Sequence, residues 1–381
     1  SVVRYFGTGE EEADYSGQQT PNVEIDGWGM MMWAARQYVD ASGDTAWLSS
    51  PTRAGSVYDA LRGGVAAPLE ANLESNGIVT ADSSIWEVHD QNKRHYAYTT
   101  LAAARGFCDM AAIAKKAGNS GDTGKYAGLS KRVRDGFFAA FVDPQQALAG
   151  SIEGLGSGKY YDGAVAEAFT WNVLPDFTND TAKATLDLLG RLRVDSGGYK
   201  RNNDGLSSYD NNEWILVDLR IANSLRRAGR GGEADGVVGT IVAKAASNFY
   251  LLPELFNAVP QDGQIGKYTG SIPMVGYGGG AYTLTMLDRS GLIEPNDCGD
   301  DKGVTLPKID CTGVTVGPGG PGNGADGGAG DNGAVPDASQ VPFVNACLCN
   351  LVPEHPLSAR ALALLLCMPV LLLARRRLRG R

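Results

Sequence analysis

The residue pair Trp86-Glu87 is the strongest candidate for chemistry in this sequence. It lies in the polar stretch Asp82–Asp90, between two long segments whose apolar residues recur at helical spacing. A carboxyl group beside a large aromatic ring can act as a proton donor, because apolar surroundings favour its protonated form. An isolated Trp-Glu pair is more often part of an ordinary loop, so this prediction depends on what the fold brings to it.

Helical periodicity predicts an all-α body of about nine helices, with no convincing run of period two. The predicted helices cover residues 26–41, 51–74, 93–117, 124–142, 164–174, 180–194, 212–229, 232–249 and 279–290. Connections after the second, fourth, sixth and eighth helices are long, whereas the others are short. Helices joined by short loops alternate in direction, so we expect the long loops and the segment before Asp26 to converge on one face.

This arrangement brings a second carboxylate toward the first. Glu87 lies in the first long loop and Glu254 in the fourth, so the two would face each other across one opening. The second loop contributes Tyr161 and Asp162 to the same face, and the third contributes three further candidates, Arg201, Tyr209 and Trp214. Aromatic rings with polar groups suit a sugar, which offers apolar faces and many hydroxyls. Taken singly, such polar residues are common in turns.

Composition excludes several classes of function. Six of the 34 basic residues lie from Pro356 onward, so residues 1–355 carry 28 basic and 43 acidic groups, a formal charge of −15. A body this acidic lacks the basic footprint of a nucleic-acid-binding protein, and a neutral substrate suits it better. Three histidines leave little for zinc or Ser-His catalysis, and no Gly-rich phosphate loop follows a strand. We therefore expect no metal and no cofactor.

The composition divides the chain into three parts. Residues 1–295 form the predicted helical domain, residues 296–345 a Gly-, Pro- and Asp-rich linker, and residues 346–381 a tail. The tail contains Cys347-Leu348-Cys349, a short apolar run over Ala361–Ala374 and a terminal arginine cluster. Cys298 and Cys311 bracket a short loop and could form a disulfide in an oxidising compartment, a hypothesis that counting free thiols would test.

Several short motifs occur in order over roughly residues 20–290. They are Glu24-Ile25-Asp26-Gly27-Trp28-Gly29, Ser84-Ile85-Trp86-Glu87, Tyr161-Asp162-Gly163-Ala164, Asn211-Asn212-Glu213-Trp214 and Leu252-Pro253-Glu254. Together they resemble glycoside hydrolase family 15, the glucoamylase-like enzymes. The resemblance implies an (α/α)6 barrel whose first helices would lie in a missing start, since the chain begins at Ser1 without Met or a leader segment.

The resemblance also implies a reaction. Glu87 falls on the general acid and Glu254 on the general base of an inverting, exo-acting α-glucoside hydrolase. We expect the substrate to be contacted by Asp26, Trp28, Trp86, Tyr161, Asp162, Arg201, Tyr209 and Trp214, although Trp28 lies on a helical pattern typical of core residues. The family usually has Asp-Leu-Trp-Glu-Glu where this chain has Ser84 and Val88 in place of the flanking acids. This departure bears on substrate preference, and starch, dextran, isomalto-oligosaccharides and trehalose-like disaccharides all stay open.

The tail resembles the MYXO-CTERM kind of sorting signal, with a spacer, a Cys-x-Cys region, a short apolar helix and an arginine cluster. That resemblance implies export and association with the cell surface through the membrane, before any processing of the tail. Two rivals to the hydrolase hypothesis follow from the same features. One is a carbohydrate-binding surface protein that keeps the barrel without the activity, and the other is a structural helical domain on a membrane stalk.

Overall fold

The computed structural model describes residues 4–5, 11–12, 23–88, 92–174, 176–205, 208–259, 264–268 and 275–290. The predicted linker, the tail and the Cys298–Cys311 pairing lie outside these residues. Within the described ranges, no helix is both long enough and apolar enough to cross a membrane.

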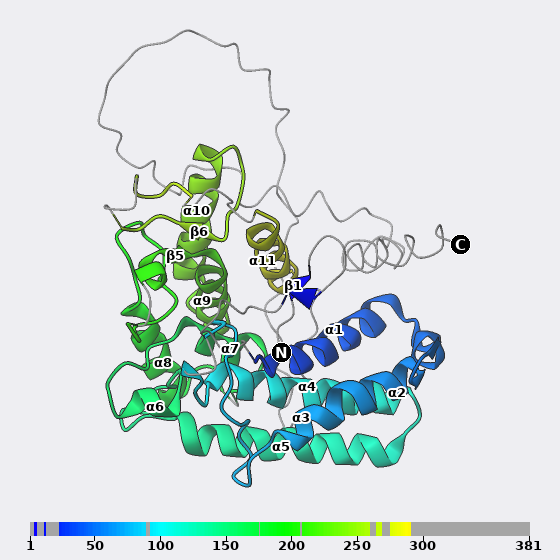
Figure 1. The fold of residues 1–381 in the computed structure, drawn as a ribbon. Helices are drawn as coiled ribbons and strands as arrows, with labels where there is room; N and C mark the ends of the chain where they lie inside the picture. The colour runs from blue at the N-terminus through cyan, green and yellow to red at the C-terminus, as the bar shows by residue number, and fades with distance from the viewer. Residues whose placement is uncertain are drawn as a thin grey trace, which may run out of the picture.

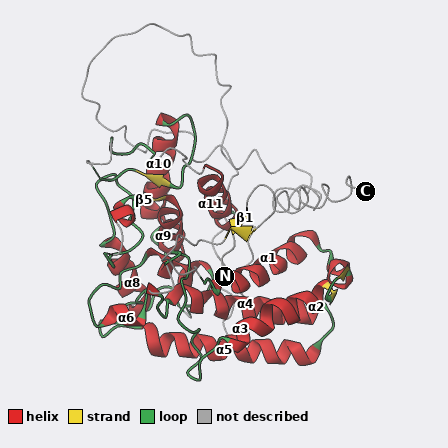
Figure 2. Ribbon diagram, in the orientation of Figure 1, coloured by secondary structure: helices red, strands yellow, loops and turns green. Residues whose placement is uncertain are grey.

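Helices dominate the described part of the chain, as Figure 2 shows, which confirms the predicted all-α class. The longer helices are α1 (Asp26–Ser42), α4 (Ala97–Lys116), α5 (Ser120–Phe141), α8 (Asp180–Gly190), α9 (Ile215–Arg227), α10 (Gly231–Ser247) and α11 (Val275–Arg289). The short ones are α2 (Val57–Leu61), α3 (Ala67–Ala71), α6 (Ile152–Leu155) and α7 (Glu167–Thr170), with η1 (Thr45–Ser49), the π-helical η2 (Arg62–Ala66), η4 (Gly163–Ala166) and η5 (Ser208–Asn211).

Among the described residues, the strands form antiparallel pairs in which each strand has two residues. These are β1 (Arg4–Tyr5) with β2 (Glu11–Glu12), β3 (Pro51–Thr52) with β4 (Gly55–Ser56), and β5 (Glu213–Trp214) with β6 (Leu255–Phe256). Such short strands leave no period-two signal in the sequence, so the prediction did not include them. The pair β5–β6 matters most, because it joins the third long connection to the fourth.

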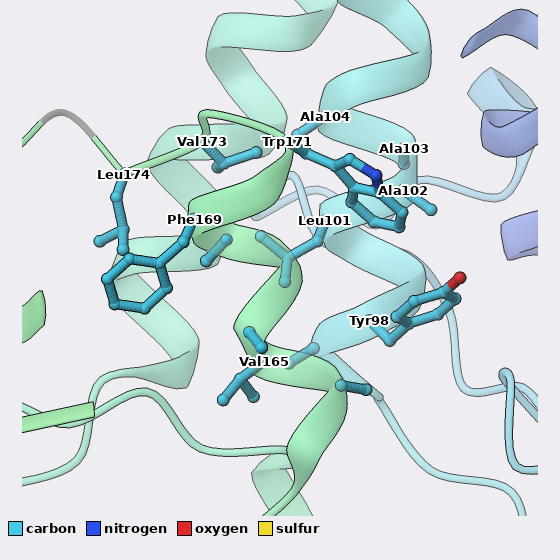
Figure 3. Packing of buried hydrophobic residues seen from close by; sticks show 14 of the residues in the cluster. Tyr98, Leu101, Ala102, Ala103, Ala104, Val165, Phe169, Trp171, Val173 and Leu174 are labelled. Carbon is cyan, nitrogen blue, oxygen red and sulfur yellow. The ribbon is translucent and has the colours of Figure 1, made fainter. Parts of the chain in front are cut away.

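The helices form two groups, which Figure 1 shows in one view. Helix α4 packs against both α1 and α5 in the lower part of the view, and α9 packs against α10 and α11 at the upper left. Helix α7 contacts both α4 and α9, so it joins the groups. Figure 3 shows the apolar side chains at this junction, where small alanines of α4 leave room for large rings. The labelled residues are Tyr98, Leu101, Ala102, Ala103, Ala104, Val165, Phe169, Trp171, Val173 and Leu174.

Two glycines let α1 and α4 approach closely. A Cβ added to Gly29 would lie 2.2 Å from the carbonyl oxygen of Ala102. A Cβ added to Gly106 would lie 2.6 Å from the Cα of Gly29 and 2.8 Å from the Cε of Met32. The two backbones therefore meet with no side chain between them, and this contact fixes the helix that begins at Asp26.

The structure corrects the ends of several predicted helices. The predicted helix 51–74 is a β3–β4 hairpin as far as Ser56, and its helical part runs from Val57 through η2 to Ala71. Gly55, with a φ of +103°, begins β4 directly after the hairpin turn, and Ser56 and Asp59 form a reciprocal capping box that starts α2. Local cap and turn chemistry thus overrides the apolar pattern.

Other boundaries move for similar reasons. Helix α5 begins at Ser120 rather than residue 124, because the Asn119 side chain accepts the Asp122 N–H at 3.1 Å. Helix α9 begins at Ile215 rather than residue 212, because the two preceding residues form β5. Helix α8 ends at Gly190, short of the predicted residue 194, and α11 begins at Val275, before the predicted residue 279.

The glycine contact between α1 and α4 gives a test of the fold. We expect Gly106→Ala to lower the free energy of unfolding by about 1–3 kcal/mol, because the added methyl group overpacks the contact with Gly29 and Met32. The control is Gly128→Ala in α5, an exposed position where an added Cβ meets nothing within 4 Å. That change should raise stability by about 0.5–1 kcal/mol. Urea titration of both variants checks this, and equal effects would contradict it.

Candidate active site

The first, second and third long connections meet through Trp86 and Arg201. The Trp86 indole N–H donates to Asp162 Oδ2 at 2.8 Å, and the Gly163 N–H donates to the Arg201 carbonyl at 2.7 Å. The Arg201 guanidinium then lies 5.1 Å from the centroid of the Trp86 ring. Three segments that are far apart in sequence are therefore in direct contact, as loop alternation predicted.

The fourth connection and the segment before Asp26 join the same group. The Tyr209 hydroxyl donates to Glu254 Oε2 at 2.8 Å, and the Ile215 N–H donates to the Glu254 carbonyl at 3.2 Å. On the other side, the Ile25 N–H donates to Asp82 Oδ2 at 2.9 Å. The predicted convergence of the long loops and the segment before Asp26 is thus present in the structure.

The turn that carries Glu87 is strained. Ser84 and Glu87 have φ values of +50° and +52°, in the left-handed region that non-glycine residues rarely adopt. Such positions cost on the order of 1–3 kcal/mol each and persist where the surroundings hold them. Here Trp86, between the two residues, is 5% exposed and hydrogen bonded to Asp162. The buried ring anchors the turn, and Glu87 is left exposed.

Aromatic rings pack around the Arg201 guanidinium. It lies 4.7 Å from the Trp214 centroid and 6.0 Å from that of Tyr209, and the Trp214 ring packs edge-on against Trp86 at 5.7 Å. Arg201 Nη2 also pairs with Asp210 Oδ1 at 2.5 Å. Burial raises the pKa of Asp210, and the Arg201 charge opposes this shift. The arginine thus fixes the positions of three predicted site residues relative to each other.

The charges of both candidate carboxylates contribute to raising the pKa values of two tyrosines. Burial raises the pKa of Tyr209, with further contributions from the hydrogen bond and charge of Glu254 and from the charge of Glu87. Burial also raises the pKa of Tyr277 on α11, followed by the charges of Glu254 and Glu87. Arg201 lies over both the Trp86 and the Tyr209 rings, and the Tyr209 hydroxyl donates to Glu254, so the turn that carries Glu87 and the loop that carries Glu254 lie close together.

Three further acids lie around Glu87. Burial, followed by the charges of Asp26, Glu87 and Asp82, raises the pKa of Glu24 to about 8. Burial raises the pKa of Asp26 to about 6, and the Glu87 charge adds to the shift. Burial raises the pKa of Asp82 to about 7 against its hydrogen bonds from Ile25 and Thr99. Asp26 Oδ1 and Glu24 Oε1 are buried without a hydrogen-bond partner among the described residues.

A buried ion pair involves Glu213, the residue before Trp214 in β5. Lys244 Nζ donates to both carboxylate oxygens of Glu213, which is fully buried in β5. Asp218 Oδ1 accepts the Tyr199 N–H at 2.6 Å, and burial together with the neighbouring Glu213 raises the pKa of Asp218 well above its usual value. Removing one partner of such a buried pair typically costs about 3–5 kcal/mol, because the other charge is left buried without a partner.

Two predicted site residues have contacts elsewhere. Trp28 lies in the first turn of α1 and packs, partly buried, against the apolar core. The Tyr161 hydroxyl accepts a hydrogen bond from Arg191 Nη1 at 2.7 Å, and the Arg191 guanidinium lies 5.5 Å from the Tyr161 centroid. The contacts of Tyr161 therefore lead toward Arg191 and away from the two carboxylates.

Sequence reasoning missed several residues of this group. Glu24 stands two positions before Asp26 in a quoted motif, and Asp82 opens the loop that carries Glu87, so proximity in sequence was an available signal. Tyr277 lies in a Gly-rich run, which gave no sequence signal for a role in the site. The pairing of Lys244 with Glu213 depends on how α10 packs on α9, which no local pattern encodes.

Comparison with known proteins rests on solved structures, because no family model and no curated protein sequence matches this chain. A glycosidase superposes with a TM-score of 0.52 at 20% identity, over 70% of this chain and 67% of that one. A glycosidase variant in complex with glucose gives 0.51 at 18% identity over the same shares of 70% and 67%. The glucoamylase from Saccharomycopsis fibuligera gives 0.51 at 14% identity, over 76% and 75% of the two chains.

The fold is that of the glucoamylase-like (α/α)6 barrels. This confirms the predicted fold class. Sequence identities of 14–20% support a similar fold and do not assign roles to individual residues. Those roles rest on the contacts described above. In this barrel the group around Glu87 and Glu254 is built from the long connections, with the helices as a rigid support.

The buried acids of the barrel make its stability depend on pH. Asp162, like Asp82, has a pKa raised by burial to about 7, Asp26 to about 6 and Glu24 to about 8. In the unfolded chain such groups lose their proton near pH 4. Between about pH 4 and 8 the folded state therefore binds more protons than the unfolded state, and the free energy of unfolding falls as pH rises.

We expect the free energy of unfolding to decrease from pH 5 to pH 8 in denaturant titrations. Asp82→Asn should flatten this profile, since it removes one group that titrates in the window, whereas Asp135→Asn, at a side chain 63% exposed, should leave the slope unchanged. The slope is the readout, because Asp82→Asn also alters hydrogen bonds to Ile25 and Thr99. A stability that rises between pH 5 and 8 would contradict the expectation.

Proposed function

We propose that this chain is a glycoside hydrolase that releases glucose from the non-reducing ends of α-glucosides with inversion at the anomeric carbon. The observation that carries the proposal is the chain of contacts from Trp86 through Arg201 and Tyr209 to Glu254, which joins the turn of Glu87 to the second carboxylate. Two carboxylates bordering one space are what glycoside hydrolysis needs. Support for glucose comes from the neighbours of the same fold, which include a glucoamylase and a glycosidase bound to glucose.

In the proposed reaction, Glu87 gives its proton to the glycosidic oxygen as the bond to the anomeric carbon breaks. Glu254 takes a proton from a water molecule that attacks the opposite face of that carbon, so the released sugar has the β configuration. This geometry requires the two carboxyl groups to lie about 6.5–9.5 Å apart, which leaves room for the water. The hydrogen bond from Tyr209 holds the Glu254 carboxylate in orientation.

The other residues divide into two proposed roles. The buried, unpartnered oxygens of Asp26 and Glu24 are acceptors for sugar hydroxyls, because a buried acceptor without a partner is costly unless a ligand satisfies it. Trp86, Trp214 and Asp162 are 4–5% exposed. We assign them to positioning, since their contacts hold Glu87 and Tyr209 in place rather than offering a surface to the sugar.

One alternative keeps the barrel and loses the activity. Ser84 and Val88 stand where the resembled family has acids, and Ser84 is fully buried. A chain with these changes could bind a sugar without cleaving it. Binding and turnover measured on the same preparation separate the two functions.

The test is a panel of α-linked glucosides, including starch, dextran, isomaltose and trehalose, with the product anomer followed by NMR. Glu87→Gln and Glu254→Gln should each lower kcat by about 10²–10⁴-fold, the usual contribution of a general acid or base. The matched control is Glu70→Gln on α3, which removes an acid paired with Lys125 of α5. It should keep full activity.

The outcomes separate the hypotheses. Release of β-glucose that both Gln variants abolish supports the proposal. Near-normal release by both variants would remove the assignment of Glu87 and Glu254. Sugar binding without turnover in the unaltered protein would favour the binding function.

A further inference from the structure

A surface cavity of about 360 Å³ that is open to solvent is lined by the exposed Arg191 and Arg193 and the partly buried Lys200, and neither candidate carboxylate lines it. From its charge, its geometry and its size, we propose that this cavity binds a phosphate group carried by a small sugar. Nothing in the proposed hydrolysis uses these three cations, so the inference is independent of the proposed function. It rests on the side chains around this one hollow.

The cations of the cavity outnumber its acid. Glu233 is near enough to Arg193 for their charges to interact, but it is paired with Arg230. Asp195 is the acid among its lining residues, against three cations. Neither these cations nor Asp195 take part in any ion pair between described residues, whereas the nearby Arg201 and Arg230 are both paired with acids. Three cations that share a hollow repel each other at a cost, and an anion bound between them would remove it.

The net negative charge of residues 1–355 does not prevent an anion from binding in the cavity. Residues 1–355 carry a formal charge of −15, which would repel an anion at long range. At physiological ionic strength the screening length is about 8 Å, so charges inside the cavity outweigh those spread over the rest of the surface. The local cluster of cations decides which ligand the cavity favours.

Arg191 and Arg193 are each held in place by one hydrogen bond and an aromatic ring, which leaves other N–H donors for a ligand. Arg191 lies over the Tyr161 ring and donates one N–H to its hydroxyl at 2.7 Å. Arg193 lies 5.6 Å from the buried Tyr199 ring and donates to the Gly197 carbonyl at 3.3 Å. A guanidinium has five N–H donors in a fixed plane, so each keeps an edge that matches two phosphate oxygens. A phosphate would therefore meet a site that is already ordered.

The cavity is separate from the group around Arg201. Lys200 and Arg201 lie between two isolated bridges, Arg193–Tyr199 and Asp162–Asn202, and the Lys200 N–H donates to the Leu192 carbonyl at 2.9 Å. Arg201 lies on Trp214 at 4.7 Å, whereas Lys200 lines the cavity. The phosphate site would therefore lie behind the segment whose other face contacts the predicted sugar-binding residues.

The size and the remaining walls favour a phosphorylated sugar over a larger ligand. A volume of about 360 Å³ is near the lower end of the range for small-molecule pockets. Asn211 and Asp195 can bond to hydroxyl groups, and Ala258 and Val259 give an apolar wall for a ring face. A bare phosphate ion would leave these groups without contacts.

The experiment measures binding of glucose 6-phosphate, inorganic phosphate and glucose to the full chain by calorimetry, at low and at physiological salt. The variant is Arg193→Gln/Lys200→Gln, chosen because it leaves the Arg191 contact with Tyr161 intact. The matched control is Arg53→Gln/Lys183→Gln, which removes two exposed cations elsewhere. Thermal unfolding of both double variants verifies that they fold.

We expect glucose 6-phosphate to bind the unaltered chain and the control equally, and the Arg193/Lys200 variant to bind it about tenfold or more weakly. Binding should weaken with salt. Inorganic phosphate binding as tightly as the ester would assign the site to the free ion. The proposal is overturned if neither phosphate compound binds, if both double variants bind alike, or if glucose binds the cavity as well as its phosphate does. Should the double variant misfold, a salt-independent affinity in the unaltered chain would overturn it equally.

Discussion

The hydrogen bond from the Trp86 indole to the Asp162 carboxyl connects the loops of the candidate site to the helical core. Asp162 is almost fully buried, and its other oxygen accepts the Ala164 N–H, so the same carboxyl also starts η4. That short helix contacts both α4 and α9, the central helices of the two groups. Trp86 in turn supports the strained turn at Glu87. The Trp86–Asp162 hydrogen bond thereby ties the turn of Glu87, whose side chain is exposed, to the packed helices.

The helical part of the fold could be predicted because its information is local. Buried apolar residues recur along each helix, and α4 buries nearly its whole length. The ends of the helices could not be placed from that pattern. A reciprocal cap at Ser56, an Asn119 cap and two residues paired as β5 set the actual limits, and these depend on single side chains and on partners far away in sequence. The glycine contact between α1 and α4 likewise had no sequence signal beyond the two glycines.

For the candidate site, the sequence predicted which segments meet and not which atoms meet. Alternation of short and long connections was enough to predict that the loops of Glu87 and Glu254 converge, since it follows from helix direction alone. The acids around Glu87 depend on burial, and burial is a property of the packed barrel. Tyr161 shows the converse, because a residue next to Asp162 in a shared motif turns to Arg191 and away from the carboxylates. Neighbours in an extended chain face opposite ways, so one motif can serve two different places.

The backbone contact between Gly29 and α4 also fixes the rotational phase of α1. With no side chain between the two helices, α1 can neither roll about its axis nor slide along it without a backbone clash. Asp26 stands less than one turn before Gly29, so the direction of its carboxyl follows directly from that phase. Adding or deleting one residue between them would turn Asp26 by about 100° around the helix. The packing of α1 on α4 therefore fixes the spacing of these two residues.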